Sequence, residues 1–318
     1  MRSIRTVEPG GQFFELTTRT IHGRLLLRPS KRVNETILGI LARALERHPE
    51  VRLCAFVFLS NHYHLVAWAL NQEAESTFME YLNGLIARKI GRLHDWRDRL
   101  WSRRFEDIAI LDDDAVIDRI RYVLGQGVKE GLVASPYQWP GATCVRALTR
   151  GARLLGSWDD ETRRYEARKA GRNAPRDSFR TQHEIELMAP PMWSSIDERE
   201  RQKRFRKIVK EIEKEGRKRN KELHREPMGP RWVLRQHPHT RPRAMKRTRA
   251  PWCHTKSREL RVEYCARQAL RTAIYRELSA RIREGDFAAI TVLPDGCHPP
   301  PLHGSARDQF SVWRARQV

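Results

Sequence analysis

Two short apolar segments separated by five residues constrain the fold of this chain more than any other feature. Val51 to Leu59 is nearly all apolar, and Leu65 to Leu70 is a second apolar run that follows the break at Ser60-Asn61. Segments of this length and composition are typical of strands that are buried on both faces. Because a short break favours an antiparallel hairpin, we expect the two segments to pair at the centre of a sheet.

The neighbouring segments predict helices that alternate with further strands. Residues 13–20 are rich in aromatic and β-branched types, which favours a strand. Residues 33–48 and 76–93 place apolar side chains at helical spacing. A strand is predicted at 105–111 and a helix at 113–129, whose first residues are acidic N-caps. The order β, α, β, β, α, β, α predicts an α+β fold with a ferredoxin-like (split βαβ) antiparallel sheet and helices.

The chain is strongly basic, and one part of it carries most of the charge. Among 318 residues, 61 Lys and Arg stand against 39 Asp and Glu, which gives a formal net charge of +22. Residues 201–260 contain 21 of the basic and 6 of the acidic residues, and therefore carry +15 of that charge. We expect an acidic partner, with nucleic acid as the first candidate and an anionic membrane surface as the second.

Targeting signals are missing from the sequence. No run approaches the ~20 apolar residues that a membrane helix needs, and Met1 to Gln12 holds no apolar stretch of a signal peptide. The five cysteines are odd in number and include no Cys-x-x-Cys pair, so they indicate neither a disulfide framework nor a standard zinc motif. We therefore expect a cytoplasmic protein without a membrane partner.

The length predicts about two domains. We place the boundary in residues 149–180, where Arg168 to Arg176 has the composition of a linker. The remaining residues, 181–318, are expected to form a basic, mainly helical or extended region with a DNA-binding or accessory role. Within it, Arg231 to Arg249 is rich in Pro and Arg and poor in large aliphatic residues, so we expect this stretch to be extended or disordered. Helical patterns flank it at 197–226 and 257–284.

A His-x-His pair lies where the second apolar strand begins. Side chains two residues apart on a strand point to the same face, so His62 and His64 should project together while Tyr63 points into the core. Two imidazoles on one strand are suited to hold a metal ion. The alternative is a pair of ordinary histidines at a strand edge, satisfied by neighbouring groups.

The helix predicted at 113–129 offers a further ligand and a nucleophile. Tyr122 and Gln126 are four residues apart and therefore share one face of that helix. The amide oxygen of Gln126 suits a divalent cation, and the hydroxyl of Tyr122 can attack phosphorus once it is positioned or deprotonated. Taken alone, a tyrosine in this pattern is more often a partly buried core residue.

Several motifs follow one another in order across residues 13–145. They are the first strand Glu15 to Arg19, the His-x-His segment Phe56 to Leu65, the stretch Leu100 to Asp107, and the segment Tyr122 to Val133 with the trailing Ser135 to Pro140. In this order and spacing, the segment resembles the single-tyrosine HUH transposases, specifically the REP-associated tyrosine transposase branch. The resemblance does not extend to the final ~170 residues, so the prediction of a second domain in that part of the chain rests on its length and composition.

The resemblance implies an HUH fold and a catalytic domain in residues 1–148 that cuts and rejoins single-stranded DNA at or near hairpins. It implies Tyr122 as the nucleophile, which forms a 5′-phosphotyrosine link and leaves a free 3′-OH. It also implies Mg²⁺ or Mn²⁺ held by His62, His64 and Gln126. Both a monomer and a homodimer are compatible with this family. Basic and aromatic residues before the fourth strand are candidates for contacts to phosphates and bases: Arg97, Arg99, Arg103, Arg104, Trp96 and Trp101. The alternative is a solvated basic loop whose tryptophans belong to the core.

Two departures from the family pattern keep alternatives open. Gln126-Gly127 stands where the family has Asn-Pro, so the amide oxygen is kept on a longer arm while the helix end loses its proline. Ser60 also replaces a proline. One alternative is a protein of the same fold that binds hairpin DNA without cutting it. Another is a different metal phosphodiesterase or RNA-binding protein that shares only the His pair.

Overall fold

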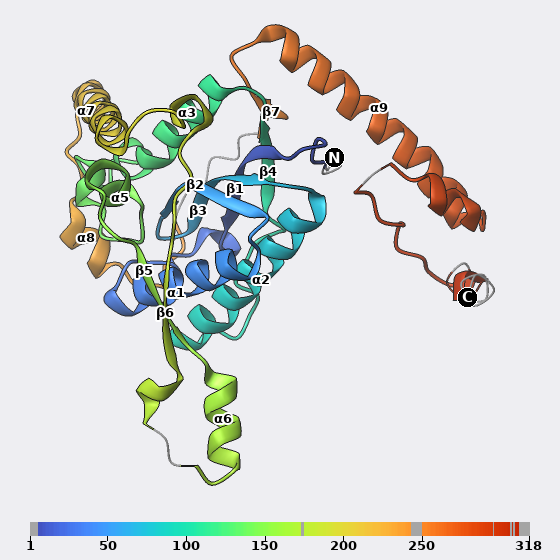
Figure 1. Ribbon diagram of the computed structural model, residues 1–318, viewed down its shortest axis with the longest axis horizontal. Coiled ribbons are helices and arrows are strands. Elements are labelled where there is room, and N and C mark those ends of the chain that lie inside the picture. The colour runs from blue at the N-terminus through green and yellow to red at the C-terminus, as the bar shows by residue number, and fades with distance from the viewer. Residues whose placement is uncertain are drawn as a thin grey trace.

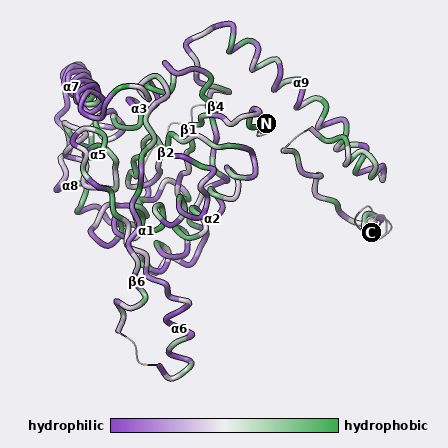
Figure 2. Tube along the Cα trace, in the orientation of Figure 1, coloured by the Kyte–Doolittle hydropathy of each residue, from purple (hydrophilic) through white to green (hydrophobic). Residues whose placement is uncertain are grey.

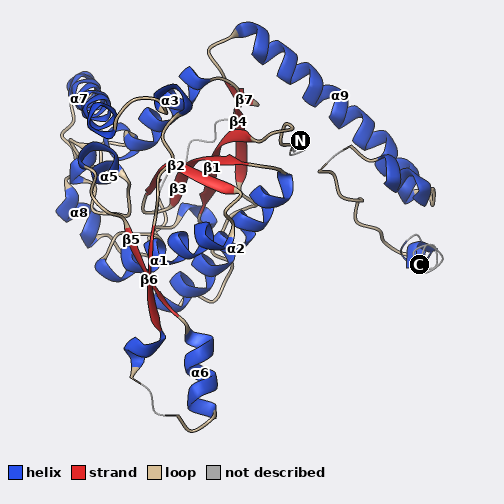
Figure 3. Cartoon of the chain, viewed as in Figure 1, coloured by secondary structure: helices blue, strands red, loops and turns tan. Residues whose placement is uncertain are grey.

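A five-stranded sheet lies at the centre of the chain (Figures 1 and 3). The computed structural model describes residues 6–311 except 173–174, 243–249, 295, 306 and 308. The spatial order β2-β3-β1-β4 is antiparallel throughout and confirms the predicted α+β, ferredoxin-like sheet, to which β7 adds in the parallel direction beside β4. The strands are β1 (Gln12–Arg19), β2 (Val51–Phe58), β3 (His62–Ala69), β4 (Glu106–Ile110) and β7 (Cys253–His254).

Helices cover both faces of this sheet. α1 (Lys31–Arg47) connects β1 to β2 and packs against α2 (Gln72–Leu93), which connects β3 to β4. Each of these helices begins at a side-chain cap, which satisfies an orphan N–H at its first turn. α2 lies on the face that carries Tyr63, since the Tyr63 hydroxyl donates to Asn83 of α2 at 2.8 Å. The opposite face, which carries the two histidines, is covered by α3 (Asp113–Leu124).

The single helix predicted at 113–129 is divided in two. α3 ends at Leu124, and α4 (Gln126–Lys129) follows directly after Gly125, whose backbone stays in the helical region. The amide of Lys129 donates to the carbonyl of Gly125 at 2.8 Å, so the chain turns in nearly the same direction through the break. The structure therefore differs from the predicted single helix only at Gly125, which interrupts it. This interruption lies between Tyr122 and Gln126.

Residues 149–180, which we expected as a linker, contain regular structure that packs on the domain. α5 (Val145–Arg150) leads into β5 (Leu155–Asp159), α6 (Glu161–Lys169) and β6 (Arg180–Glu184), and β5 pairs antiparallel with β6. The hairpin lies along α1, where a Cβ on Gly39 would stand 2.1 Å from the carbonyl oxygen of Ser157. The linker interpretation failed because a composition rich in charge also suits a hairpin that one helix covers.

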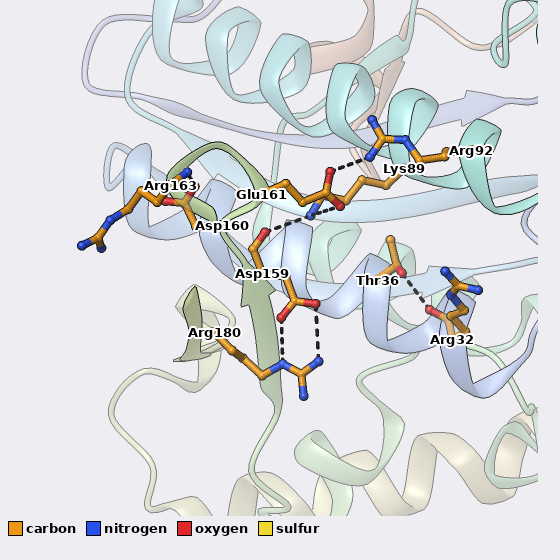
Figure 4. Close-up of polar contacts among 9 residues, drawn as sticks. All are labelled: Arg32, Thr36, Lys89, Arg92, Asp159, Asp160, Glu161, Arg163 and Arg180. Carbon is orange, nitrogen blue, oxygen red and sulfur yellow. Dashed lines mark hydrogen bonds and ion pairs between the residues drawn. The ribbon is translucent and has the colours of Figure 1, made fainter. Parts of the chain in front are cut away.

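Ion pairs and hydrogen bonds hold the base of this hairpin on the helices (Figure 4). Lys89 donates to the carbonyl of Asp159 at 3.3 Å, and Arg92 lies 2.5 Å from Glu161. Across the hairpin, Arg180 pairs with the side chain of Asp159 at 2.8 Å. These contacts join residues that are far apart in the sequence, which is why local composition did not reveal them.

The C-terminal region is mainly helical, as predicted. α7 (Glu198–Glu222) and α9 (Arg258–Arg283) coincide with the two helical patterns, and α7 is largely hydrophilic along its length (Figure 2). In the stretch expected to be extended, residues 230–235 form the short helix α8 (Pro230–Arg235), while residues 243–249 lie outside the described residues. In the part of the chain that the structure describes, no helix is both long and apolar enough to cross a membrane.

α7 packs directly against α3 and α4. A Cβ on Gly216 of α7 would come within 2.3 Å of a methyl carbon of Val128 in α4, so α7 approaches α4 closely at this glycine. Arg121 adds ion pairs to Glu211 at 3.4 Å and to Glu215 at 2.5 Å. The C-terminal region therefore fixes the position of the segment that carries Gln126 and Lys129.

Candidate active site

The two histidines of β3 lie together on one face of the sheet. The rings of His62 and His64 have centroids 5.1 Å apart and planes at 80°. Tyr63 points to the other face, where its side chain is fully buried and its hydroxyl bonds to Thr18 and Asn83. The alternation of a strand that is buried on both faces produces this arrangement. Both histidines are buried, so their imidazoles are withdrawn from bulk water.

Each histidine has an oxygen partner at Nδ1. His62 Nδ1 lies 2.7 Å from Asn61 Oδ1, and His64 Nδ1 lies 2.9 Å from a carboxylate oxygen of Glu15. These oxygens accept a hydrogen bond from Nδ1–H, which leaves the lone pair on Nε2 in each ring. Burial lowers the pKa of His62 well below 6.5, so this ring is neutral at pH 7. An imidazole whose Nδ1 is held by an oxygen partner has the form that metal-ligating histidines take in proteins.

Glu15 of β1 is the centre of a buried polar network that the sequence did not reveal. Its side chain is 3% exposed and is contacted by groups from three other elements. His64 lies 2.9 Å from one oxygen, and His254 of β7 lies 2.9 Å from the other, with Arg119 of α3 at 3.5 Å. Burial alone would raise the pKa of Glu15, but contacts with His254 and His64 outweigh it and hold the pKa well below its usual range. Glu15 is therefore ionised and fixes the orientation of His64.

Tyr122 lies beside the histidine pair and between two cations. Its ring centroid is 5.6 Å from that of His64, with the planes at 87°. Lys129 donates to the Tyr122 hydroxyl at 3.2 Å, and its Nζ lies 4.3 Å from the ring centroid. The guanidinium of Arg119 lies 4.7 Å from the same centroid. The two cations lie where they can neutralise the negative charge of a phosphate that approaches this hydroxyl.

Gln126 is buried at the turn between Tyr122 and Lys129. Its side chain is 2% exposed, and its Nε2 has no hydrogen-bond partner. A buried amide group without a partner costs free energy, so it requires a reason. Gln126 lies between Tyr122 and Lys129 in the sequence. The hydrogen bond from Lys129 to Tyr122 joins the two ends of the segment that contains it. Assignment of amide oxygen and nitrogen depends on the hydrogen-bond network, so this amide can present its oxygen to a ligand instead.

The structure brings His62 and His64 together, whereas a divalent-cation site that also includes Gln126 stays a prediction. The predicted ligands, His62, His64 and Gln126, would provide two imidazole nitrogens and one amide oxygen. The unpartnered amide of Gln126 is the observation that favours this assignment. Among the described residues, no group of three or more His, Cys, Asp or Glu is arranged to hold a metal ion.

The basic loop before β4 lies at the surface, whereas its two tryptophans pack against other residues of the chain. Trp101 is half-buried, donates to the carbonyl of Asn83 at 3.0 Å and meets Tyr63 edge to face. Trp96 is half-buried between Arg24 and His239. Contact of these tryptophans and arginines with DNA remains a prediction. The four arginines of this loop are exposed, with Arg97 paired to Asp95 and Arg103 paired to Glu106: Arg97, Arg99, Arg103 and Arg104.

The fold and the site together define an α+β protein with a buried histidine pair that faces a tyrosine. No family model matches the chain, and no curated protein matches it. Among solved structures, it is similar to a REP-associated tyrosine transposase bound to a REP hairpin, at 19% identity and a TM-score of 0.40, over 48% of this chain and 87% of that one. It is also similar to a candidate transposase from Deinococcus radiodurans R1, at 18% identity and a TM-score of 0.28, over 40% and 98% of the two chains.

Proposed function

We propose that this chain is a metal-dependent tyrosine transposase that cuts and rejoins single-stranded DNA at or near hairpins. The observation that carries the proposal is the position of Tyr122, whose ring meets His64 and whose hydroxyl is held by Lys129. A nucleophile, two candidate metal ligands and a cation thus meet on one face of the sheet. This is the arrangement that attack on a phosphodiester needs. The assembly can be a monomer or a homodimer.

Tyr122 supplies the covalent step of the proposed reaction. Its hydroxyl oxygen bonds to phosphorus and releases its proton to solvent, while the bond from phosphorus to the 3′ oxygen breaks. The 3′ oxygen leaves as a hydroxyl, and the 5′ phosphate stays on Tyr122. The reverse attack by a 3′-OH restores the phosphodiester, so no external energy source is required.

Charged and polar groups around Tyr122 prepare this step. Lys129 and Arg119 stabilise negative charge at the hydroxyl and on the phosphate. Glu15 and Asn61 hold the two imidazoles in one orientation. Mg²⁺ or Mn²⁺, when bound by His62, His64 and Gln126, would supply Lewis acidity at a phosphate oxygen. Most of the rate gain would come from positioning and charge neutralisation.

The test is a search for a covalent protein–DNA adduct. Labelled single-stranded hairpin oligonucleotides from the flanks of the encoding locus are incubated with protein and Mn²⁺, and denaturing gels compare wild type with Tyr122→Phe. Tyr81→Phe is the matched control, because Tyr81 is also partly buried but lies on α2. We expect an adduct from wild type and the control, and none from Tyr122→Phe. Cleavage that survives Tyr122→Phe would show a hydrolytic metal nuclease instead.

The second candidate function is a hairpin-binding protein that does not cut. Gly127 in place of proline favours it because the helix end beside Gln126 is less constrained, and the basic α7 favours it because such a helix would add phosphate contacts that cleavage does not need. The same gels decide between the two. Tight binding of hairpins by wild type, without adduct in either Mg²⁺ or Mn²⁺, would contradict the transposase and support the hairpin-binding protein that does not cut.

A further inference from the structure

A large cavity lies next to the candidate active site, between α3, residues 251–256 and α9. Its volume is about 920 Å³, within the range of ~300–1,000 Å³ that is usual for pockets holding small ligands. Figure 1 shows how β7 joins the sheet beside β4 and how α9 then leads away from it. We call it the Trp252 pocket; its polar and aromatic lining includes Asp118, Arg119, Trp252, His254, Lys256 and Arg261.

Two residues of the lining connect the Trp252 pocket to the catalytic groups. His254 and Arg119 both contact Glu15, which holds His64. Arg119 also lies 4.7 Å from the centre of the Tyr122 ring. The pocket is therefore separated from the candidate nucleophile by a single side chain. A DNA strand with a phosphate at Tyr122 would carry a neighbouring nucleotide to the mouth of this pocket.

The lining has the chemistry of a nucleotide site. Trp252 is 50% exposed, so its indole is accessible inside a concave surface. Arg261 is exposed at the start of α9, where one guanidinium nitrogen donates to the carbonyl of Thr255 at 3.2 Å. Lys256 pairs with Asp118 across the pocket wall. An accessible aromatic ring together with cations provides stacking for a base and charge for its phosphate.

We propose that the Trp252 pocket binds one unpaired nucleotide of the substrate strand, with its base on Trp252 and its phosphate at Arg261. This proposal rests on the proposed function, since it places the nucleotide next to the phosphate that Tyr122 attacks. An unpaired base is required because a base held in a pair cannot enter the pocket without its partner base. The pocket thereby makes the C-terminal region a part of substrate recognition.

The experiment measures DNA affinity by fluorescence anisotropy, using one hairpin with an unpaired flank and the same hairpin with a blunt end. Trp252→Ala should weaken binding of the flanked hairpin about 5- to 100-fold, which is the range for loss of one stacked base. Trp252→Phe should restore most of the affinity, because a phenyl ring still stacks. Trp232→Ala is the matched control, since Trp232 of α8 is 48% exposed and lies outside the pocket. We expect it to change affinity less than 2-fold.

The outcomes separate this pocket from the cleavage chemistry. Equal affinity of Trp252→Ala and Trp232→Ala for the flanked hairpin would overturn the pocket proposal, even where the Tyr122-dependent adduct forms. A loss confined to the flanked hairpin, in a protein that forms no adduct, would keep the pocket and overturn the transposase. Full competition by deoxythymidine monophosphate at the affinity of the flanked hairpin would show a free-nucleotide site and overturn the strand site. Unchanged thermal melting of each variant establishes that it is folded.

Discussion

Glu15→Gln tests whether the buried carboxylate organises the site. The substitution keeps the shape of the side chain but replaces an ionised group by a neutral amide in contact with His64, His254 and Arg119. Breaking one partner of a buried charge pair costs about 3–5 kcal/mol, and the amide keeps part of the hydrogen bonding. We therefore expect the free energy of unfolding to fall by about 3 kcal/mol, which lowers Tm by about 4–5 °C in a chain of 318 residues.

Thermal and urea denaturation followed by circular dichroism measure this loss. Glu161→Gln is the matched control, since Glu161 is exposed and its ion pairs with Arg92 and Lys89 should contribute about 0.5 kcal/mol or less. The low pKa of Glu15 gives the sign of the pH dependence. The stability that ionised Glu15 gives the folded protein is complete above pH 4.5, the ordinary pKa of a glutamate. This contribution declines as the pH falls below that value. The difference between wild type and Glu15→Gln should therefore narrow in acid.

The same variant has a second readout in metal affinity. Removal of a group that orients a metal-ligating histidine weakens metal binding by about 10- to 100-fold. Electron paramagnetic resonance of free Mn²⁺ measures this directly, without DNA or activity. A stability loss below about 1 kcal/mol, equal to that of Glu161→Gln, would refute the role of Glu15 as the centre of the network. Unchanged Mn²⁺ affinity with a large stability loss would restrict that role to folding.

Three further predictions follow from the site. Gln126→Leu should leave the metal-free protein as stable as wild type or up to about 1 kcal/mol more stable, because it removes a buried Nε2 group without a partner. Calorimetry measures this stability. Titration with Mn²⁺ should show that the variant binds the metal about 10-fold more weakly. The low pKa of His62 means that the unfolded chain gains a proton below pH 6.5 that the folded chain does not. Unfolding free energy should therefore fall by up to about 1.4 kcal/mol per pH unit between pH 6.5 and 5, and His62→Gln should remove this slope in urea titrations. Lys129→Met should slow adduct formation by Tyr122 about 10- to 100-fold with DNA affinity nearly unchanged, and Lys129→Arg should restore most of the rate in single-turnover assays.

Local sequence patterns predicted the sheet and the histidine pair because these depend on neighbouring residues. The two apolar runs determine a buried hairpin, and strand alternation alone places His62 and His64 on one face. The family resemblance, and not helical spacing, indicated that Tyr122 joins the histidine pair, and the structure places its ring against His64 because α3 crosses that face of the sheet. Gly125 and Gly127 also indicated where this helix runs out, and α3 ends at Leu124, directly before Gly125.

Contacts between distant segments could not be predicted in this way. Glu15 and His254 are separated by most of the chain, and only the parallel pairing of β7 with β4 brings His254 to the carboxylate. The one local signal for Glu15 was a carboxylate on the inward face of a strand that is otherwise apolar or β-branched. The hairpin of β5 and β6 was missed for the same reason, because its stability depends on its approach to Gly39 of α1.

The position of these contacts explains why the N-terminal motifs alone are an incomplete description of the site. β7 contributes His254 to the network behind His64, and α7 packs against Val128 beside Gln126. The C-terminal region thus contacts neighbours of the candidate metal ligands in two places, Glu15 behind His64 and Val128 beside Gln126. Loss of the proline at position 127 leaves a helix end that the local sequence constrains weakly, and the close approach of Gly216 supplies a constraint from α7 in its place. On this reasoning the long basic extension has a structural function at the site in addition to any contact with nucleic acid.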